Sequence, residues 1–160
     1  MANAIHVLAG ATGAVLHTFA GPLQFEHPYG VCVTPTDAII VADFGNDRLQ
    51  EVPALGRGTA TLLGVGLLQR PFLVALTAAE DALVVRQSGG TNRVVVLARD
   101  GRSLLRVLLT VDDVAPGHEG HVGLAVSRDG VVAAADWSQQ KIVLCDVKQR
   151  TPSLAAGREL

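Results

Sequence analysis

The residues best equipped for chemistry lie in one loop of the C-terminal third of the chain. Its acidic and imidazole side chains fall within ten positions: Asp112, Asp113, His118, Glu119 and His121. Carboxylates and imidazoles at such close spacing are ligands for Zn²⁺ or Ca²⁺. This loop is therefore the first candidate for a metal site.

The order of these side chains does not match a metal-binding motif. His118 and His121 are three positions apart, whereas two imidazoles share one face of a zinc-binding helix when they are four apart. Pro116 and Gly117 also disfavour a helix here. We interpret the segment as a solvated loop, and we assign no catalytic, cofactor-binding or metal-ligating residue in this chain.

Two cysteines are the other reactive groups of the chain. Cys32 and Cys145 both stand inside apolar runs, Gly-Val-Cys-Val and Ile-Val-Leu-Cys, where a free thiol behaves as a small buried apolar group. Neither has a neighbouring Cys or His at zinc-site spacing. We expect two structural thiols, with a disulfide or a metal ligand as the alternative.

Composition limits the classes of partner. Of the 160 residues 49% are hydrophobic, so a substantial core is feasible, and the net charge of −2 gives no electrostatic reason to expect nucleic acid. The uncharged N-terminal stretch is interrupted by Gly10, Thr12 and His17, which argues against a signal peptide or a membrane span. We expect no membrane association, and a cytoplasmic location is favoured.

The elements that would position these groups form an internal repeat. Three apolar runs that end in a hydroxyl residue begin the units, at 28–34, 71–77 and 121–127. A second apolar run follows each of them, at 38–42, 82–85 and 131–135. A polar turn and a basic residue come next, Arg48, Arg93 and Lys141, which stand 45 and then 48 positions apart. Such short runs of Val and Ile between turn residues are typical of strands.

A fourth strand completes each unit, and Asp100-Gly101 between apolar runs indicates a hairpin. The N-terminal segment 5–16 has the same strand, turn and strand as 94–105. A four-stranded unit that recurs every ~40 to 45 residues predicts an all-β chain of antiparallel β-propeller blades. The expected units are a half blade at 4–19 and blades at about 28–63, 71–109 and 121–156, within one domain over 1–160.

The first unit resembles the NHL repeat. That family has a Pro-x-Gly-Val entry, a strand that ends in Ala-Asp, and an Asn-x-Arg-(Ile/Leu)-Gln turn, which match Pro28 to Val31, Ala42-Asp43 and Asn46 to Gln50. The other units diverge: the second has Arg86-Gln87 in place of Ala-Asp, and the third has Gln139 and Lys141 in place of Asn and Arg.

Four residues of this first unit have an expected structural role. Asp43 would accept hydrogen bonds from backbone amides, and Arg48 would pair with a carboxylate or a carbonyl group. Gly45 and Asn46 tolerate the left-handed backbone angles that turns can require. We therefore expect these residues to shape the blade rather than to contact a ligand.

The resemblance implies a six-bladed propeller-like protein that acts as a non-catalytic scaffold for a protein or peptide partner. RNA binding is an alternative, although aromatic residues make up only 4% of the chain. A metal-dependent lyase or hydrolase is a further alternative and would need His or acidic residues on inner strands. The inner strands at 31–33, 74–76 and 124–126 contain none.

About three and a half blades cannot form a closed ring, since propellers typically have ~4 to 8 blades. We expect closure either through self-association or through the remainder of a longer chain. Two copies whose half blades completed each other would make a seven-bladed ring. An open arc with unpaired edge strands is the alternative.

Overall fold

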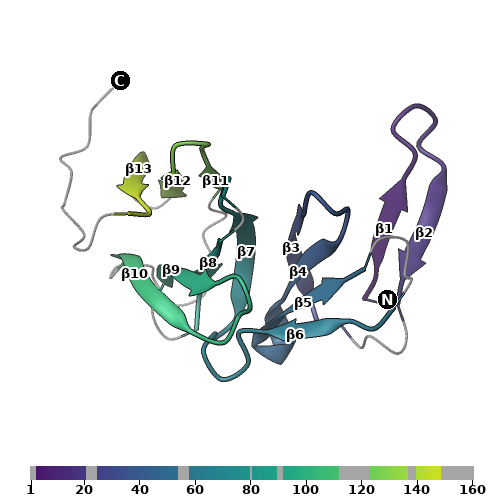
Figure 1. Cartoon of the computed structure of the whole chain (residues 1–160), viewed down its shortest axis with the longest axis horizontal. Coiled ribbons are helices and arrows are strands. Elements are labelled where there is room, and N and C mark those ends of the chain that lie inside the picture. Colours follow the sequence, from purple (N-terminus) through teal and green to yellow (C-terminus); the bar gives the residue numbers. More distant parts are fainter. Residues whose placement is uncertain are drawn as a thin grey trace.

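The protein is an all-β chain in the computed structural model (Figure 1). The residues that the structure describes are 3–20, 25–53, 58–79, 81–89, 92–111, 123–136 and 140–148. They contain thirteen strands and one short 3-10 helix. Within these residues there is no helix long and apolar enough to cross a membrane.

The strands form four antiparallel sheets, and each sheet is a meander of strands that are consecutive in the sequence. The first sheet holds two strands, β1 (Ile5–Leu8) and β2 (Val15–Phe19). The second holds β3 (Pro28–Val33), β4 (Ile39–Asp43), β5 (Arg48–Val52) and β6 (Thr61–Leu63). The third holds β7 (Pro71–Leu76), β8 (Ala82–Gln87), β9 (Asn92–Ala98) and β10 (Leu104–Val111). The fourth holds β11 (Leu124–Val126), β12 (Val131–Asp136) and β13 (Lys141–Asp146).

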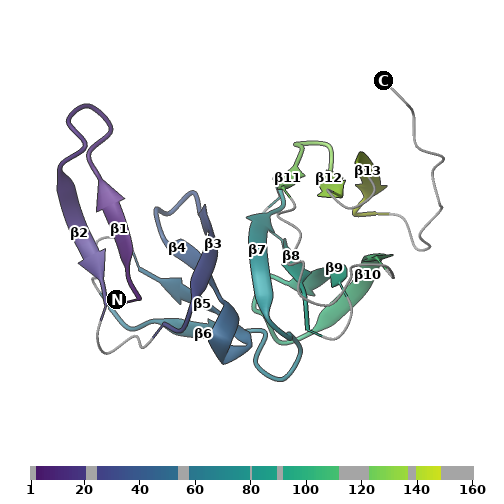
Figure 2. The ribbon, with the colours of Figure 1, turned by 180° about the vertical axis from the view of Figure 1, so that it is seen from behind.

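The four sheets follow one another in chain order along an open arc, as both faces of the molecule show (Figures 1 and 2). The expected fold of antiparallel propeller blades in an incomplete ring is confirmed. We call the sheets the half blade, the first blade, the second blade and the third blade. The expected fourth strand of the third blade, toward residue 156, lies outside the described residues.

The core lies between the sheets, because a single sheet cannot bury either face alone. Every residue of β4 and of β8 is buried. Three apolar clusters fill the three junctions. Between the first and second blades the buried residues include Ile40, Leu49, Leu83 and Leu97. Between the second and third they include Val84, Val96 and Val132. Between the half blade and the first they include Phe19, Val41 and Val52.

The hydroxyl residue that ends each inner strand holds the following turn together. The side-chain oxygens of Thr34, Thr77 and Ser127 each accept a hydrogen bond from the backbone N–H at or next to the start of the second strand, at 3.1, 3.2 and 3.0 Å. Because the side chain satisfies a backbone donor in a tight turn, the same residue class recurs at the same place.

The inner strands of the first two blades touch through their backbones. A Cβ atom at Gly30 would lie 2.7 Å from the carbonyl oxygen of Phe72 and 2.8 Å from the Cα of Leu73. No side chain fits in that space. The glycine of the Pro-x-Gly-Val entry is therefore needed for the close approach of β3 to β7.

The half blade has the geometry of the last two strands of a full blade. In the hairpins β1–β2 and β9–β10, Ala9 and Ala98 donate their N–H to the carbonyl group five residues on, at 2.8 and 2.9 Å. Gly13 and Gly101 close the two turns at φ 69° and 68°. Segment 5–19 thus corresponds to a third and a fourth strand.

Arginines link neighbouring blades. Arg99 of the second blade makes two hydrogen bonds to the carboxylate of Glu51 in the first, at 2.9 and 2.6 Å. Arg106 of the second blade donates to the carbonyl oxygen of Val147 in the third. Both junctions therefore combine apolar stacking with a charge-assisted contact near the surface.

Candidate functional site

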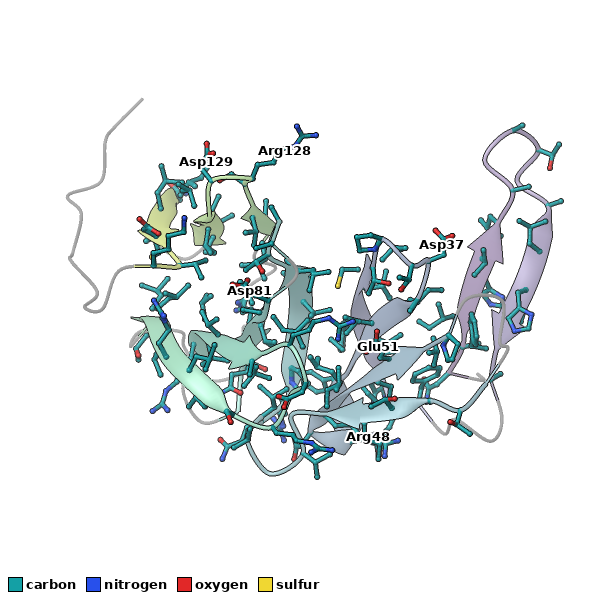
Figure 3. All side chains as sticks on the ribbon, viewed as in Figure 1. Asp37, Arg48, Glu51, Asp81, Arg128 and Asp129 are labelled. Atoms are coloured by element: carbon teal, nitrogen blue, oxygen red, sulfur yellow. The ribbon has the colours of Figure 1, made fainter. Side chains whose placement is uncertain are left out.

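One end of the blades carries the polar side chains of the motif. We call it the entry edge: β3 and β7 begin there, and the turns β4–β5 and β8–β9 lie beside them. The turns β3–β4 and β7–β8 form the opposite edge. In Figure 3, Arg48 marks the entry edge of the first blade and Asp37 marks the opposite edge of that blade.

Asp43 is the centre of the entry edge in the first blade. Its carboxylate is fully buried. The Oδ1 atom accepts the backbone N–H of Glu26 at 2.7 Å. The Oδ2 atom accepts hydrogen bonds from Asn46, Arg48 and Gln50 at 2.9, 2.9 and 2.7 Å. Arg48 pairs with a carboxylate as expected, and the four donors offset the cost of burying the charge.

Gly45 and Asn46 do not take the left-handed backbone angles that they could tolerate. Phe44–Asn46 form the 3-10 helix, which is right-handed, and the left-handed residue is Asp47 at φ 52°, where that helix ends. Gly45 instead lies close against Glu26. A Cβ atom there would lie 2.4 Å from Cγ of Glu26, and the N–H of Gly45 donates to the Glu26 carbonyl at 2.8 Å.

The second blade builds the same frame from other residues. Gln87 stands where the first blade has Asp43, and its Oε1 accepts the backbone N–H of Gln69 at 3.0 Å. Gly89 donates to the Gln69 carbonyl at 3.2 Å, as Gly45 does to Glu26. Arg93 lies opposite Gln87 in the strand register, as Arg48 lies opposite Asp43.

Aromatic side chains gather beside these turns. The rings of Tyr29 and Phe72 are stacked, with centroids 4.3 Å apart. Phe44 meets both rings edge-on, at 5.2 Å from Tyr29 and 6.3 Å from Phe72. Phe72 is buried, whereas Tyr29 is 48% exposed. The result is a supported aromatic surface on the entry edge.

Two arginines complete this group, which we call the aromatic–arginine cluster: Tyr29, Phe44, Phe72, Arg70 and Arg86. Arg70 is exposed, and its guanidinium lies 5.9 Å from the ring centroid of Phe44. Arg86 is buried, lies 5.5 Å from the Phe72 ring and donates to Asn92 at 3.3 Å. Both distances fit cation–π contacts.

Sequence reasoning did not identify this cluster. Tyr29 and Phe72 were placed only as strand residues. The available signal was their position, since each follows the proline that begins an inner strand. That signal gives matched positions in two blades, but it does not show that the two rings stack.

A family model for the NHL repeat matches residues 25–51. This segment contains Asp43 with its four donors. The chain carries an NHL repeat within an open β-propeller. No curated protein matches the chain.

Solved structures with the same fold are about twice as long. This chain is 16% identical to a streptogramin B lyase, with a TM-score of 0.54 over 92% of this chain and 49% of that chain. It is 14% identical to a putative 6-phosphogluconolactonase from Bacteroides uniformis, with a TM-score of 0.58 over 98% and 49%. It is 14% identical to virginiamycin B lyase from Staphylococcus aureus, with a TM-score of 0.55 over 92% and 50%. At these identities the likeness shows the fold alone, and the chain spans about half the length of each.

The metal candidates of the sequence are not among the described residues of the entry edge. Asp112, Asp113, His118, Glu119 and His121 all fall outside the described residues. In the ranges that the structure does describe, no group of three or more His, Cys, Asp or Glu is placed to hold a metal ion.

The two cysteines are free thiols in different blades, Cys32 on β3 and Cys145 on β13. Burial raises the pKa of Cys32 to about 11, while nearby Arg99 lowers the pKa and Glu51 raises it by smaller amounts. Burial also raises the pKa of Cys145. Since the thiolate is the nucleophile and the metal ligand, neither thiol is activated.

Proposed function

We propose that the chain is a non-catalytic binding module whose entry edge holds a protein or peptide partner. The observation that carries the proposal is the aromatic–arginine cluster, in which exposed Arg70 and half-exposed Tyr29 stand beside Phe44. Tyrosine and arginine are the residue types that dominate binding energy at protein interfaces.

The cluster is held in place before any partner arrives. The backbone N–H of Arg70 donates to the carboxylate of Asp47 at 2.7 Å, and the Tyr29 ring is stacked on Phe72. A fixed backbone and a supported ring lose less conformational entropy on binding than free side chains do. These contacts favour a recognition surface over a purely structural cluster.

The test uses peptides selected from a random displayed library on the whole chain. Binding of the selected peptides is then measured to the wild type, to Arg70→Ala and to Arg102→Ala. We expect Arg70→Ala to weaken binding about 30-fold, the ratio for a hot spot of about 2 kcal/mol. Arg102 is an exposed arginine in the β9–β10 turn of the opposite edge, so Arg102→Ala should leave binding unchanged.

Two results would count against this function. If no peptide is selected, or if both variants bind as the wild type does, the entry edge is not the binding surface. If instead mixed-sequence single-stranded RNA is retained on a filter at low salt and Arg70→Ala abolishes retention, the partner is RNA, because stacking on aromatic rings and arginine contacts also hold single strands.

A metal-dependent lyase or hydrolase is the second candidate. It is favoured only by the likeness to a streptogramin B lyase, a putative 6-phosphogluconolactonase and virginiamycin B lyase, which share the fold at 16%, 14% and 14% identity. Elemental analysis of the purified chain separates the two functions. Stoichiometric zinc or calcium would favour the enzyme, and its absence is expected for the binding module.

A further inference from the structure

The entry edges of the first and second blades share one backbone frame. Glu26 and Gln69 hold the same place in it, since each donates its N–H to the side chain that ends the second strand and accepts the N–H of the glycine in the following turn. His27 and Arg70 come next, and both have left-handed backbones, at φ 49° and 48°. The residues of the two edges can therefore be matched position by position.

The two edges differ in charge at six matched positions. On the first edge the residues are Glu26, His27, Ala42, Asp43, Asp47 and Arg48. On the second edge, in the same order, they are Gln69, Arg70, Arg86, Gln87, Asn92 and Arg93. Each carboxylate of the first edge corresponds to an amide in the second, and the histidine and the alanine correspond to arginines. Three carboxylates and one arginine give the first edge a formal charge of −2, whereas three arginines give the second +3.

Two of the three arginines are exposed to solvent, Arg70 and Arg93. They stand at the same end of neighbouring strands, because Pro71, next to Arg70, pairs with Gln87, and Gln87 pairs with Arg93. Neighbouring strands lie ~4.8 Å apart, so the backbones of the two arginines are separated by about 10 Å. Among the described side chains neither guanidinium forms an ion pair. Arg70 and Arg93 thus make an exposed cationic surface, which we call the arginine face.

The first blade shows how an arginine at this position is neutralised from within. Arg48 holds the position of Arg93, and its Nε lies 2.9 Å from Oδ2 of the buried Asp43 carboxylate. Gln87 stands in the place of Asp43 and carries no charge. Arg93 therefore remains available to an anion from outside its blade.

We propose, resting on the binding function above, that the segment held at the entry edge is an extended acidic peptide whose carboxylates bind Arg70 and Arg93. A guanidinium pairs with a carboxylate through two parallel N–H···O bonds. An extended chain advances ~3.3 Å per residue, so acidic residues about three positions apart reach both arginines. An apolar residue before them would lie on Tyr29, whose ring is half-exposed.

The distribution of charge favours a short acidic peptide over a nucleic acid. The arginine face is confined to the second blade, and Glu26 and Asp47 are exposed on the edge of the first. Asp47 borders the arginine face directly, since its Oδ1 accepts the backbone N–H of Arg70 at 2.7 Å. A nucleic acid carries a charge on every phosphate, so its chain would be repelled where it continued onto the first blade. A peptide can place acidic residues on one blade and neutral residues on the other.

The probe is a synthetic peptide in which a proline is followed by two glutamates about three positions apart, in an otherwise neutral sequence. The control peptide has glutamine in place of both glutamates. Binding to the whole chain is measured by fluorescence anisotropy at low and at high salt. The protein variants are Arg70→Gln and Arg93→Gln, and the matched control is Arg102→Gln, at the exposed arginine of the opposite edge.

We expect the glutamine peptide to bind at least about 10-fold more weakly than the glutamate peptide. Arg70→Gln and Arg93→Gln should each weaken binding of the glutamate peptide about 10-fold, the effect of losing one charged hydrogen-bond partner, whereas Arg102→Gln should bind as the wild type does. High salt should remove most of the difference between the peptides, since exposed charges are screened. Charge reversal separates pairing from misfolding, because Arg93→Glu should prefer a peptide with lysine in place of glutamate.

Several results would overturn the acidic partner while the binding module stands. One is a set of library peptides that lose affinity in Arg70→Ala but contain no excess of acidic residues. Equal binding of the glutamate and glutamine peptides is another, as is unchanged binding in Arg93→Gln. If single-stranded RNA displaces the glutamate peptide and Arg93→Gln weakens RNA binding, the arginine face binds nucleic acid instead. Failure to select any peptide would overturn both proposals.

Discussion

The first and second blades build one turn with different chemistry. In the first blade the buried Asp43 carboxylate collects four donors, three of them on Oδ2. In the second blade neutral Gln87 has the matching backbone contact, to the N–H of Gln69, as its side-chain hydrogen bond within the described residues. The backbone contact and the close glycines are common to both turns, whereas the carboxylate of the first blade adds a network on its Oδ2 atom.

The largest effect should come from removing the carboxylate. Asp43→Ala removes the carboxylate that accepts from Arg48 and Gln50 and should cost about 3–5 kcal/mol of unfolding free energy, the range for a broken buried ion pair. Gln87→Ala removes one backbone contact and should cost about 1–3 kcal/mol. Urea unfolding of both variants measures the difference.

Asp43→Asn separates charge from shape. It preserves volume, but its amide nitrogen must face either Glu26 N–H or the three donors on Oδ2, so most of the loss should remain. If Asp43→Asn were as stable as the wild type, the network would not depend on the carboxylate, and the two blades would differ only in sequence.

Gly30→Ala should lower the stability of the folded chain by a smaller amount. The added Cβ meets the backbone of Phe72 and Leu73 at 2.7 and 2.8 Å, so β3 and β7 must separate. Overpacking of this kind costs about 1–3 kcal/mol. Gly10→Ala is the control, since a Cβ there meets nothing within 4 Å. Equal thermal midpoints of the two variants would show that the blades do not touch here.

The smallest effect on stability should come from ionisation of Cys32. The second blade has Ala75 at the matching position. The pKa raised from 9.0 to about 11 means that the folded state holds the proton more tightly. Its stabilising contribution is complete below pH 9 and is lost as the pH rises through about 11.

The rate of alkylation by iodoacetamide checks the raised pKa of Cys32. At pH 9 an ordinary thiol is about half ionised, and a thiol of pKa about 11 is about 1% ionised, so Cys32 should react roughly 50-fold more slowly in the folded chain than in urea. Cys145→Ser isolates the signal. Equal rates in the folded and unfolded chain would show that burial does not protect the thiol.

Repeat spacing predicted the strands because each sheet is made of consecutive segments with their own turn residues. Asp100-Gly101 became the turn of β9–β10, with Gly101 at φ 68°. Residue types did not show which residue of the β4–β5 turn is left-handed, since Gly45 and Asn46 both tolerate such angles whereas the 3-10 helix ends at Asp47. The neighbour of Gly45 is Glu26, well before it in the sequence, whose side chain would meet an added Cβ and whose carbonyl group accepts the N–H of Gly45.

Contacts between sheets could not be predicted from the repeat. The stack of Tyr29 on Phe72 and the pairing of Arg99 with Glu51 join residues about 45 positions apart, and their partners depend on how one blade is rotated against the next. Likewise Val31 is 49% exposed, and this exposure depends on which strands the half blade contains. Sequence alone assigns that residue to an inner strand and leaves its covering undetermined.

The meander order of every sheet has a consequence for how the chain acquires its structure. Among the described strands, pairing joins only neighbours in the sequence, so the loops closed during folding are short and each sheet can form as soon as its own segment is available. Stacking then proceeds from one sheet to its neighbour, as in other repeat proteins. Synthesis from the N-terminus would therefore build the arc one blade at a time. The outer face of the most recently formed blade would stay exposed to solvent until the next blade stacks on it.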